Sequence, residues 1–527
     1  MYKTYGYCFV INHTGSSMFE TLLTITKGTH FFKLSTISPR VRPIVVEFAK
    51  RFIRYQFVRV GRNFQRKPHM IFCTATADKA EYRFHINQLE QFEDYLTRYR
   101  IDQSHIKRVV LDVNPGLKMA IDVKPGWVER DDQVGYIDYF VNDQGPVSRL
   151  LPLQTGKGKT FCSLKAVSKI GKRFVAILRP AYLKKWEGDV HKILDIDKDS
   201  VVSIRGGDQL KSLLLMAEND LLGDIKAILV SNKTYQLWLK AYEQHRSESL
   251  HLGYAFEPDM FFDKLDAGVR LIDEVHQDLH LQFKTDLYTN VWRSIALSAT
   301  FFSKDTFTKM IQEIMYPIPN RAKVAELDKY IASCAVFYRI RDIKLIRTTE
   351  PGNINYSHNA FERSIIKNNK LLDSYLKILK FNVEKFFMCD YAQGQKCIVF
   401  ASSIEMCTIM ADFLQRQYPH LSSRRYVAED PYGNLHNSDI VVTTVQSGGT
   451  AEDVANLKTV IMTNSLDSPQ SNTQVLGRLR RNDTMPQRFA YLVCLDVEKQ
   501  VQYHSSKKEL LAQRAKNYNE LFMPFGL

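Results

Sequence analysis

Residues Pro152–Thr160 read PLQTGKGKT, and they follow a short apolar run. Glycine at 156 and 158 lets backbone amides approach a phosphate chain, because neither residue carries a side chain. Lys159 is placed to reach the β- and γ-phosphates of a nucleotide, and Thr160 to hold Mg²⁺. The strict phosphate-loop pattern has glycine at position 153, where this chain has leucine, but the shorter form TGxGKT is intact. The alternative is a turn that binds nothing. We favour nucleotide binding, by Thr155, Gly156, Lys157, Gly158, Lys159 and Thr160.

A second stretch, Val269–Gln277, reads VRLIDEVHQ. Its apolar strand delivers two adjacent carboxylates to the strand's carboxyl end, where open α/β sheets bind ligands. We expect Asp273 to position Mg²⁺ and Glu274 to orient and activate the attacking water. The alternative is an acidic turn with no ligand. The stretch Ser294–Thr300 (SIALSAT) could sense the γ-phosphate, although taken alone it is better explained as an ordinary buried strand end.

A third stretch, Gln474–Arg481, reads QVLGRLRR. A guanidinium is always charged and can stabilise the charge on a transferring γ-phosphoryl group. The spacing predicts that Arg478 and Arg481 lie one turn apart on a helix, so that both face one partner. The alternative is a basic helix face that lies on solvent or grips phosphates. The four motifs occur together in one chain: a phosphate loop, an acidic strand end, Ser-Ala-Thr and this arginine pair. It is improbable that each of them arose there by chance, independently of the others.

Short apolar runs alternate with longer helical stretches around these motifs, which is typical of a parallel sheet covered by helices. The alternation occurs twice, and we expect one lobe over residues 126–345 and another over 346–497. Residues 1–125 mix β-branched and aromatic runs with one predicted helix at 86–100, which indicates a small α+β accessory domain. Residues 498–527 are predicted to form a C-terminal helix. The predicted fold class is α/β, with two tandem lobes and the N-terminal domain.

The composition is basic, with 72 Lys and Arg against 57 Asp and Glu in 527 residues, a net charge of +15. A basic surface attracts polyanions, and nucleic acids are the commonest large ones. The eight cysteines show no CxxC spacing, which argues against a zinc site and against a secreted disulfide framework. No apolar run reaches transmembrane length and the N-terminus is polar, so we expect a soluble, cytoplasmic protein with no membrane partner.

Together the motifs resemble those of superfamily 2 helicases of the DExH type, the branch that includes UvsW-like, RadD-like and XPB-like helicases. The resemblance covers residues 127–497. It implies two RecA-like lobes, ATP with Mg²⁺ in the cleft between them, nucleic acid crossing both lobes, and 3′-to-5′ travel. The sequence has DEVH rather than DEAD, and RPAYLKKW where DEAD-box RNA helicases have a PTRELA-like segment. By analogy, both differences favour DNA over RNA.

The same resemblance implies further site residues. Gln133 lies 26 residues before Lys159, where the family has an adenine-reading glutamine. Asp453, in TTVQSGGTAEDVANL, would contact the ATP ribose. The segments LRPAYL, SNKTYQLWL, FASS and TTVQ match nucleic-acid-contacting motifs, and ordinary loop chemistry is the alternative for each. The residues that we expect to contact nucleic acid there are Arg179, Thr234, Ser402 and Thr443.

The N-terminal stretch from Arg40 to Lys67 is basic, with aromatic residues interleaved. Arg and Lys suit phosphates, and aromatic rings can stack on bases. For the aromatic residues, burial in the core is the better interpretation. For the charges, including Arg51 and Arg54, we favour contact with nucleic acid.

We therefore expect an ATP-dependent DNA helicase or translocase, an ATPase stimulated by nucleic acid. Single-stranded, forked or branched DNA would be its partner, in repair, recombination or replication, and a phage is an expected source. A duplex translocase that separates no strands, an RNA helicase, and a nucleotide-gated binding scaffold are the alternatives. Intact Glu274 and both arginines argue against a scaffold, because a switch can dispense with them.

Overall fold

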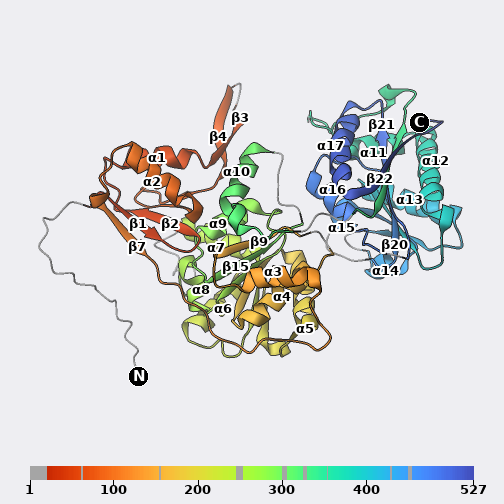
Figure 1. Cartoon of the computed structure of the whole chain (residues 1–527). Coiled ribbons are helices and arrows are strands. Elements are labelled where there is room, and N and C mark those ends of the chain that lie inside the picture. Colours follow the sequence, from red (N-terminus) through yellow and green to blue (C-terminus); the bar gives the residue numbers. More distant parts are fainter. Residues whose placement is uncertain are drawn as a thin grey trace, which may run out of the picture. The chain divides into compact units, whose positions relative to one another are not determined.

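A computed structural model of the protein (Figure 1) describes residues 21–60, 63–153, 156–244, 253–299, 305–324, 329–352, 354–427, 430–448, 454–482 and 484–527. The chain divides into two compact units. One comprises Met1–Leu151, Thr160–Leu297 and Phe301–Ala322, and the other comprises Pro152–Lys159, Ser298–Thr300 and Lys323–Leu527. None of the described helices is both long and apolar enough to cross a bilayer.

The accessory domain is a mixed sheet covered by two helices. Its described strands are ordered β5-β6-β2-β1-β7; β1 pairs antiparallel with β2 and parallel with β7. The expected helix at 86–100 is confirmed as a 3₁₀ turn followed by α2. The elements are β1 (Leu23–Lys27), β2 (Phe31–Ser35), α1 (Arg42–Lys50), β5 (Thr74–Ala75), β6 (Tyr82–His85), α2 (Leu89–Arg98) and β7 (Ile106–Val110).

Helix α1 forms in a stretch, RPIVVEF, that was expected to be one of the β-branched and aromatic runs. Proline in its first turn has the backbone angle of a helix, and Ile44, Val45, Phe48 and Ala49 bury one face. Phe48 and Phe52 are buried, which confirms that these aromatic residues belong to the core. Burial of this stripe therefore outweighs the strand preference of the branched residues.

Strands β3 (Ile53–Val60) and β4 (Asn63–Ile71) form a two-stranded sheet of their own. They pair antiparallel along their whole length. Figure 1 shows this pair extending away from α1 as a ribbon. We call β3 and β4 together the ribbon.

The first lobe is built on a parallel sheet, as expected. In the described residues the strand order is β12-β13-β10-β14-β15-β9, and every neighbouring pair is parallel. The strands are β9 (Ser148–Leu151), β10 (Phe174–Leu178), β12 (Val201–Ile204), β13 (Ala227–Ser231), β14 (Val269–Ile272) and β15 (Arg293–Leu297). The helices are α3 (Asp131–Val141), α4 (Lys159–Ile170), α5 (Leu183–Ile193), α6 (Gly207–Glu218), α7 (Asn232–Gln244), α8 (Phe261–Lys264), α9 (Leu279–Asp286) and α10 (Thr306–Met315), and β8 (Asp122–Val123) pairs with β11 (Leu194–Asp195).

The accessory domain packs on the first lobe through a shared apolar core and a buried polar cluster. Arg270 on β14 forms an ion pair with Asp286 on α9, and His85 Nε2 on β6 lies 3.4 Å from the same carboxylate. Burial by itself raises the pKa of Asp286, but Arg270 and the histidines lower it to about 2. The domain is therefore joined to the strand that leads to Asp273.

The second lobe is also a parallel sheet with helices on both faces. Among its described strands the order is β18-β19-β17-β20-β21-β16-β22. One apolar core lies between the sheet and α11–α13, and another involves α16 and α17 (Figure 1). The strands are β16 (Ile331–Tyr338), β17 (Lys396–Ala401), β18 (Ser423–Tyr426), β19 (Ile440–Thr444), β20 (Leu457–Met462), β21 (Gln487–Cys494) and β22 (Ala515–Phe522). The helices are α11 (His358–Ile366), α12 (Asn369–Phe386), α13 (Ile404–Gln417), α14 (Gly433–Asn437), α15 (Val445–Gly448), α16 (Pro469–Leu476) and α17 (Glu498–Arg514).

Two expectations for this lobe are corrected. Strand β16 pairs with β21 and β22, so the second sheet begins before the expected boundary at 345. The expected helix over 498–527 ends at Arg514, and β22 follows it. Pairing with β16 and stacking of Phe522 on Phe337, with ring centroids 4.8 Å apart, provide tertiary contacts that outweigh local helix preference.

Candidate functional site

The predicted phosphate loop connects β9 to α4. Gly156 and Gly158 have φ angles of +84° and +85°, a region that disfavours residues with side chains. Lys159 begins α4 and is 8% exposed, and the first amides of this helix have no partner within the helix. These features fit a bound phosphate chain. Thr155 lies outside the described residues.

The sheet order brings the three lobe-one motifs to one edge. Strand β15 lies between β9 and β14, and both pairings are parallel. The carboxyl ends of all three strands therefore share an edge, from which the loop of Gly156, the acidic pair and Ser298 continue directly. This is the edge where open α/β sheets bind ligands.

The acidic pair is held in a defined geometry. Trp186 Nε1 donates to Asp273 Oδ2 at 2.9 Å, and the Glu274 amide donates to Asp273 Oδ1 at 2.9 Å. Glu274 has a φ of +47°, in the left-handed region that residues with a side chain uncommonly adopt. Its Oε2 lies 3.3 Å from Nδ1 of the buried His276. Asp273 is thus oriented by two donors, and Glu274 is placed by a strained turn.

Asp278 joins this segment to two predicted nucleic-acid motifs. Arg179, which follows β10, donates from Nε and Nη2 to its carboxylate at 2.6 and 2.8 Å. Asn232, the first residue of α7, donates to Asp278 Oδ2 at 2.8 Å. The Asp278 hydrogen bonds raise the pKa of Arg179. Arg179, predicted to contact nucleic acid, is therefore also a structural link to the acidic segment.

The remaining predicted nucleotide contacts lie in different parts of the chain. Gln133 is buried on α3, where its Oε1 accepts a hydrogen bond from the Arg130 amide at 3.2 Å. This bond caps the start of the helix. Asp453 and Thr300 lie outside the described residues.

Two threonines predicted to contact nucleic acid have buried hydroxyls with internal partners. Thr234 Oγ1 accepts from the Gly206 amide at 2.8 Å. Thr443 Oγ1 donates to the Tyr426 carbonyl at 2.5 Å. Each hydroxyl fixes a neighbouring backbone segment, and nucleic-acid contact at these positions remains a prediction.

The loop after β17 is held by a buried carboxylate. Glu362 on α11 accepts from the amides of Ser402 and Ser403 at 2.7 and 2.8 Å and from the Ser403 hydroxyl at 2.6 Å. The Ser402 hydroxyl donates to Asn359 Oδ1 at 2.6 Å. Burial raises the pKa of Glu362 to about 7, against the effect of these donors. Glu362 is therefore a positioning residue for the loop in which we predicted a nucleic-acid contact.

The arginine pair does not lie on a helix, in contrast to the prediction. Helix α16 ends at Leu476, with Gly477 as its C-cap, and the amides of Arg478 and Leu479 bond three residues back. Beyond the end of the helix, the Leu479 carbonyl accepts a hydrogen bond from the Tyr330 hydroxyl at 2.7 Å. Arg478 is buried and Arg481 is exposed.

The two basic residues predicted near the N-terminus make contacts within the protein. Arg51 stacks over Phe48 and Tyr95, with its guanidinium 5.6 and 5.4 Å from the ring centroids. Arg54 donates from both terminal nitrogens to Asp305, at 2.8 and 3.2 Å. Arg54 thereby ties the ribbon to the first lobe.

No protein-family model matches the chain, and no curated protein matches it. The solved structures that are similar to it include the following three. The Hef helicase domain of Pyrococcus furiosus is 15% identical, with a TM-score of 0.45 over 72% of this chain and 98% of that one. T4 UvsW is 12% identical, with a TM-score of 0.32 over 95% and 99%. Mss116p bound to ssRNA and AMP-PNP is 14% identical, with a TM-score of 0.47 over 75% of each chain.

Sequence reasoning missed four residues of this site. Asp278 and Trp186 had a visible signal, since Asp278 is the third acid of DEVHQD and Trp186 ends RPAYLKKW. Asn232 lies inside a quoted motif, but nothing marked its side chain. Glu362 had no signal, because its burial depends on tertiary packing.

Proposed function

We propose that this chain is an ATP-driven DNA motor, a helicase or translocase that remodels forked or branched DNA in repair, recombination or replication. The observation that carries the proposal is the order β14-β15-β9. It presents a glycine-rich phosphate loop and an Asp-Glu pair from one edge of a parallel sheet. A binding scaffold needs no water-activating carboxylate at that edge.

The residues of the first lobe fit ATP and Mg²⁺. The backbone of Gly156 and Gly158 and the side chain of Lys159 would hold the phosphates, and Thr160 and Asp273 would hold the metal. Mg²⁺ would neutralise charge on the transferring phosphoryl group. Glu274 would accept a proton from the attacking water. His276 Nδ1 lies 3.3 Å from Glu274 Oε2 and would help to hold that carboxylate in place. The arginines at 478 and 481 would supply positive charge to a transferring phosphoryl group.

Coupling to nucleic acid would run through Asp278. Arg179 and Asn232 come from the two first-lobe segments predicted to contact the strand, and both bond this carboxylate. A strand that moves either segment would act on the turn that holds Glu274. In the second lobe, Glu362 holds the loop of Ser402, which would contact nucleic acid.

The preference for DNA rests on sequence differences from RNA helicases, and the net charge of +15 suits either polymer. The test is steady-state ATP hydrolysis on single-stranded DNA, duplex DNA, a fork, a four-way junction and RNA, with Lys159→Ala as a control. We expect the fork and junction to stimulate most, and Lys159→Ala to abolish the rate. Stimulation by RNA alone would establish an RNA helicase, and no hydrolysis on any of them would overturn the proposal.

A further inference from the structure

The ribbon is exposed along the middle of β4. Gln65 to His69 are consecutive and all exposed, so both faces of β4 meet solvent there. Gln56 on β3 is exposed as well. An isolated two-stranded ribbon is at best marginally stable in water. Its length therefore has no explanation in the packing of the domain.

The ribbon is also strongly basic. Between Ile53 and Ile71 there are five Arg and Lys residues and no Asp or Glu. The guanidinium of Arg66 on β4 lies 4.2 Å over the ring of Tyr55 on β3. Within the described residues neither Arg66 nor Lys67 forms an ion pair. Both charges are available to an anionic partner.

The root of the ribbon is fixed to the first lobe. Arg54 is paired with Asp305, whose carboxylate also accepts from the Thr308 amide at 2.8 Å and so caps α10. His280 on α9 bonds the Ile71 carbonyl at 3.0 Å. Next to it Phe72 packs edge-on against Phe283, with centroids 5.1 Å apart. These contacts give the ribbon a defined direction from the lobe that carries the phosphate loop.

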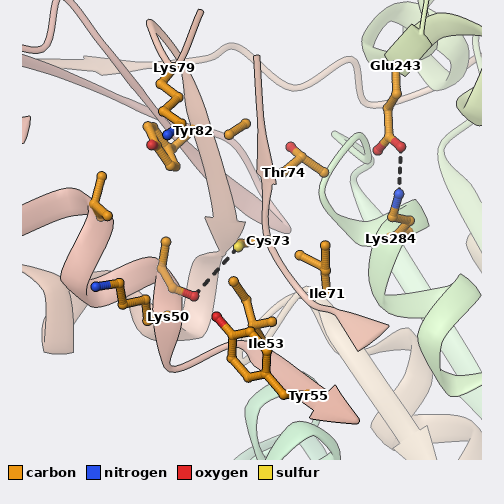
Figure 2. Close-up of a pocket in the computed structure, with 13 residues that line it drawn as sticks. Lys50, Ile53, Tyr55, Ile71, Cys73, Thr74, Lys79, Tyr82, Glu243 and Lys284 are labelled. Carbon is orange, nitrogen blue, oxygen red and sulfur yellow. Dashed lines mark hydrogen bonds and ion pairs between the residues drawn. The ribbon is translucent and has the colours of Figure 1, made fainter. Parts of the chain in front are cut away.

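A cavity of about 540 Å³ at the foot of the ribbon extends its basic surface. Figure 2 shows Lys50, Tyr55 and Tyr82 on the accessory-domain side and the Glu243–Lys284 pair on the first-lobe side. Lys50 and Lys79 in its lining are exposed. Positive charge therefore continues from β4 to the body of the protein.

We infer that the ribbon enters the major groove of duplex DNA. The inference rests on the proposed function and names the substrate form that it meets. A major groove about 12 Å wide admits a two-stranded ribbon. Eight or nine residues at about 3.3 Å each span roughly 25–30 Å, close to one helical turn of DNA. Arg66 and Lys67 then meet the flanking phosphates. The deep, narrow major groove of duplex RNA excludes the ribbon.

The experiment is binding of the full chain, without nucleotide, to a fluorescent 20-base-pair DNA duplex and to the RNA duplex of the same sequence. The variant Arg66→Gln/Lys67→Gln removes two exposed charges without touching the root. We expect its DNA affinity to fall at least roughly ten-fold. The salt slope should fall by about two, because each lost phosphate contact removes about 0.9. Its RNA-duplex affinity should change little.

A matched control is Lys198→Gln/Lys226→Gln. These lysines precede β12 and β13, at the amino edge of the sheet, and removing them should leave DNA affinity at the parent value. Unchanged DNA binding by the ribbon variant, or equal losses on DNA and RNA duplexes, would overturn the inference. ATP hydrolysis by the parent protein on single-stranded DNA tests the proposed function separately, so one can fail without the other.

Discussion

Arg179 and Asp278 form a two-pronged ion pair, with nitrogen–oxygen distances of 2.6 and 2.8 Å. The arginine follows β10 and the aspartate follows the acidic pair by four residues. A residue predicted to contact the strand is therefore tied to the segment that carries the acidic pair.

Replacing Asp278 with Asn should weaken this link while leaving the phosphate loop intact. We expect the basal ATPase rate to stay within a few-fold and the stimulation by single-stranded DNA to fall about ten-fold or more. Because the pair is partly exposed, its loss should lower the free energy of unfolding by no more than about 1 kcal/mol. The ratio of stimulated to basal rates is the readout. A ratio equal to that of the parent would show that the pair is only structural.

The two arginines of the turn after α16 should act on the rate and not on nucleotide affinity. Arg478→Ala and Arg481→Ala should each lower kcat by about 10³-fold or more, as for inserted arginines in related phosphoryl transfer. ATP affinity, measured by a fluorescent analogue, should change only a few-fold. Arg424→Ala, at an exposed arginine on β18, serves as the matched control. Full activity of both variants would remove these arginines from the mechanism.

Lys507 on α17 should make the second lobe less stable near neutral pH. Its ammonium is buried 3.4 Å from Met462 Sδ and 4.7 Å from the Tyr491 ring, and burial lowers its pKa to about 7. Because the unfolded chain binds a proton at Lys507 more readily than the folded chain does, the free energy of unfolding falls as the pH falls. The fall begins near the unfolded pKa of 10.5 and continues to about pH 7.

The variant Lys507→Met should therefore raise the free energy of unfolding by up to about 4 kcal/mol at pH 7 and by about 1 kcal/mol at pH 10. Thermal unfolding of the full chain across this pH range measures the difference. A gain that is the same at pH 7 and pH 10 would contradict the account of this lysine.

The sequence was sufficient for the parts of the fold that local pattern determines. Strands β9, β14 and β15 of the first lobe were predicted from apolar runs, and their shared edge follows from the parallel alternation. The end of α16 at Leu476 was not predicted, and the turn that follows it is held by a residue far away in sequence, since the Tyr330 hydroxyl bonds the Leu479 carbonyl. The strand β22 was not predicted either, because its pairing partner β16 lies almost 180 residues earlier.

In the candidate site, too, some residues could be predicted from local sequence pattern and others depend on tertiary contacts. Residues that do chemistry occur in short motifs such as GKGKT and DEVH, whose spacing is fixed by the ligand. Residues that hold those motifs in place are selected by three-dimensional packing. Glu362 is 40 residues from Ser402, and no pattern in the sequence relates them.

The most direct test of the central claim is the ATP hydrolysis rate of Glu274→Gln against the parent protein, at saturating single-stranded DNA. Loss of a general base predicts a fall of about 10²–10⁴-fold. The affinity for ATP should stay within a few-fold, because the phosphate loop is unchanged. A variant that hydrolyses ATP at the parent rate would contradict the account, and the acidic pair would then be no more than a turn at the end of a strand.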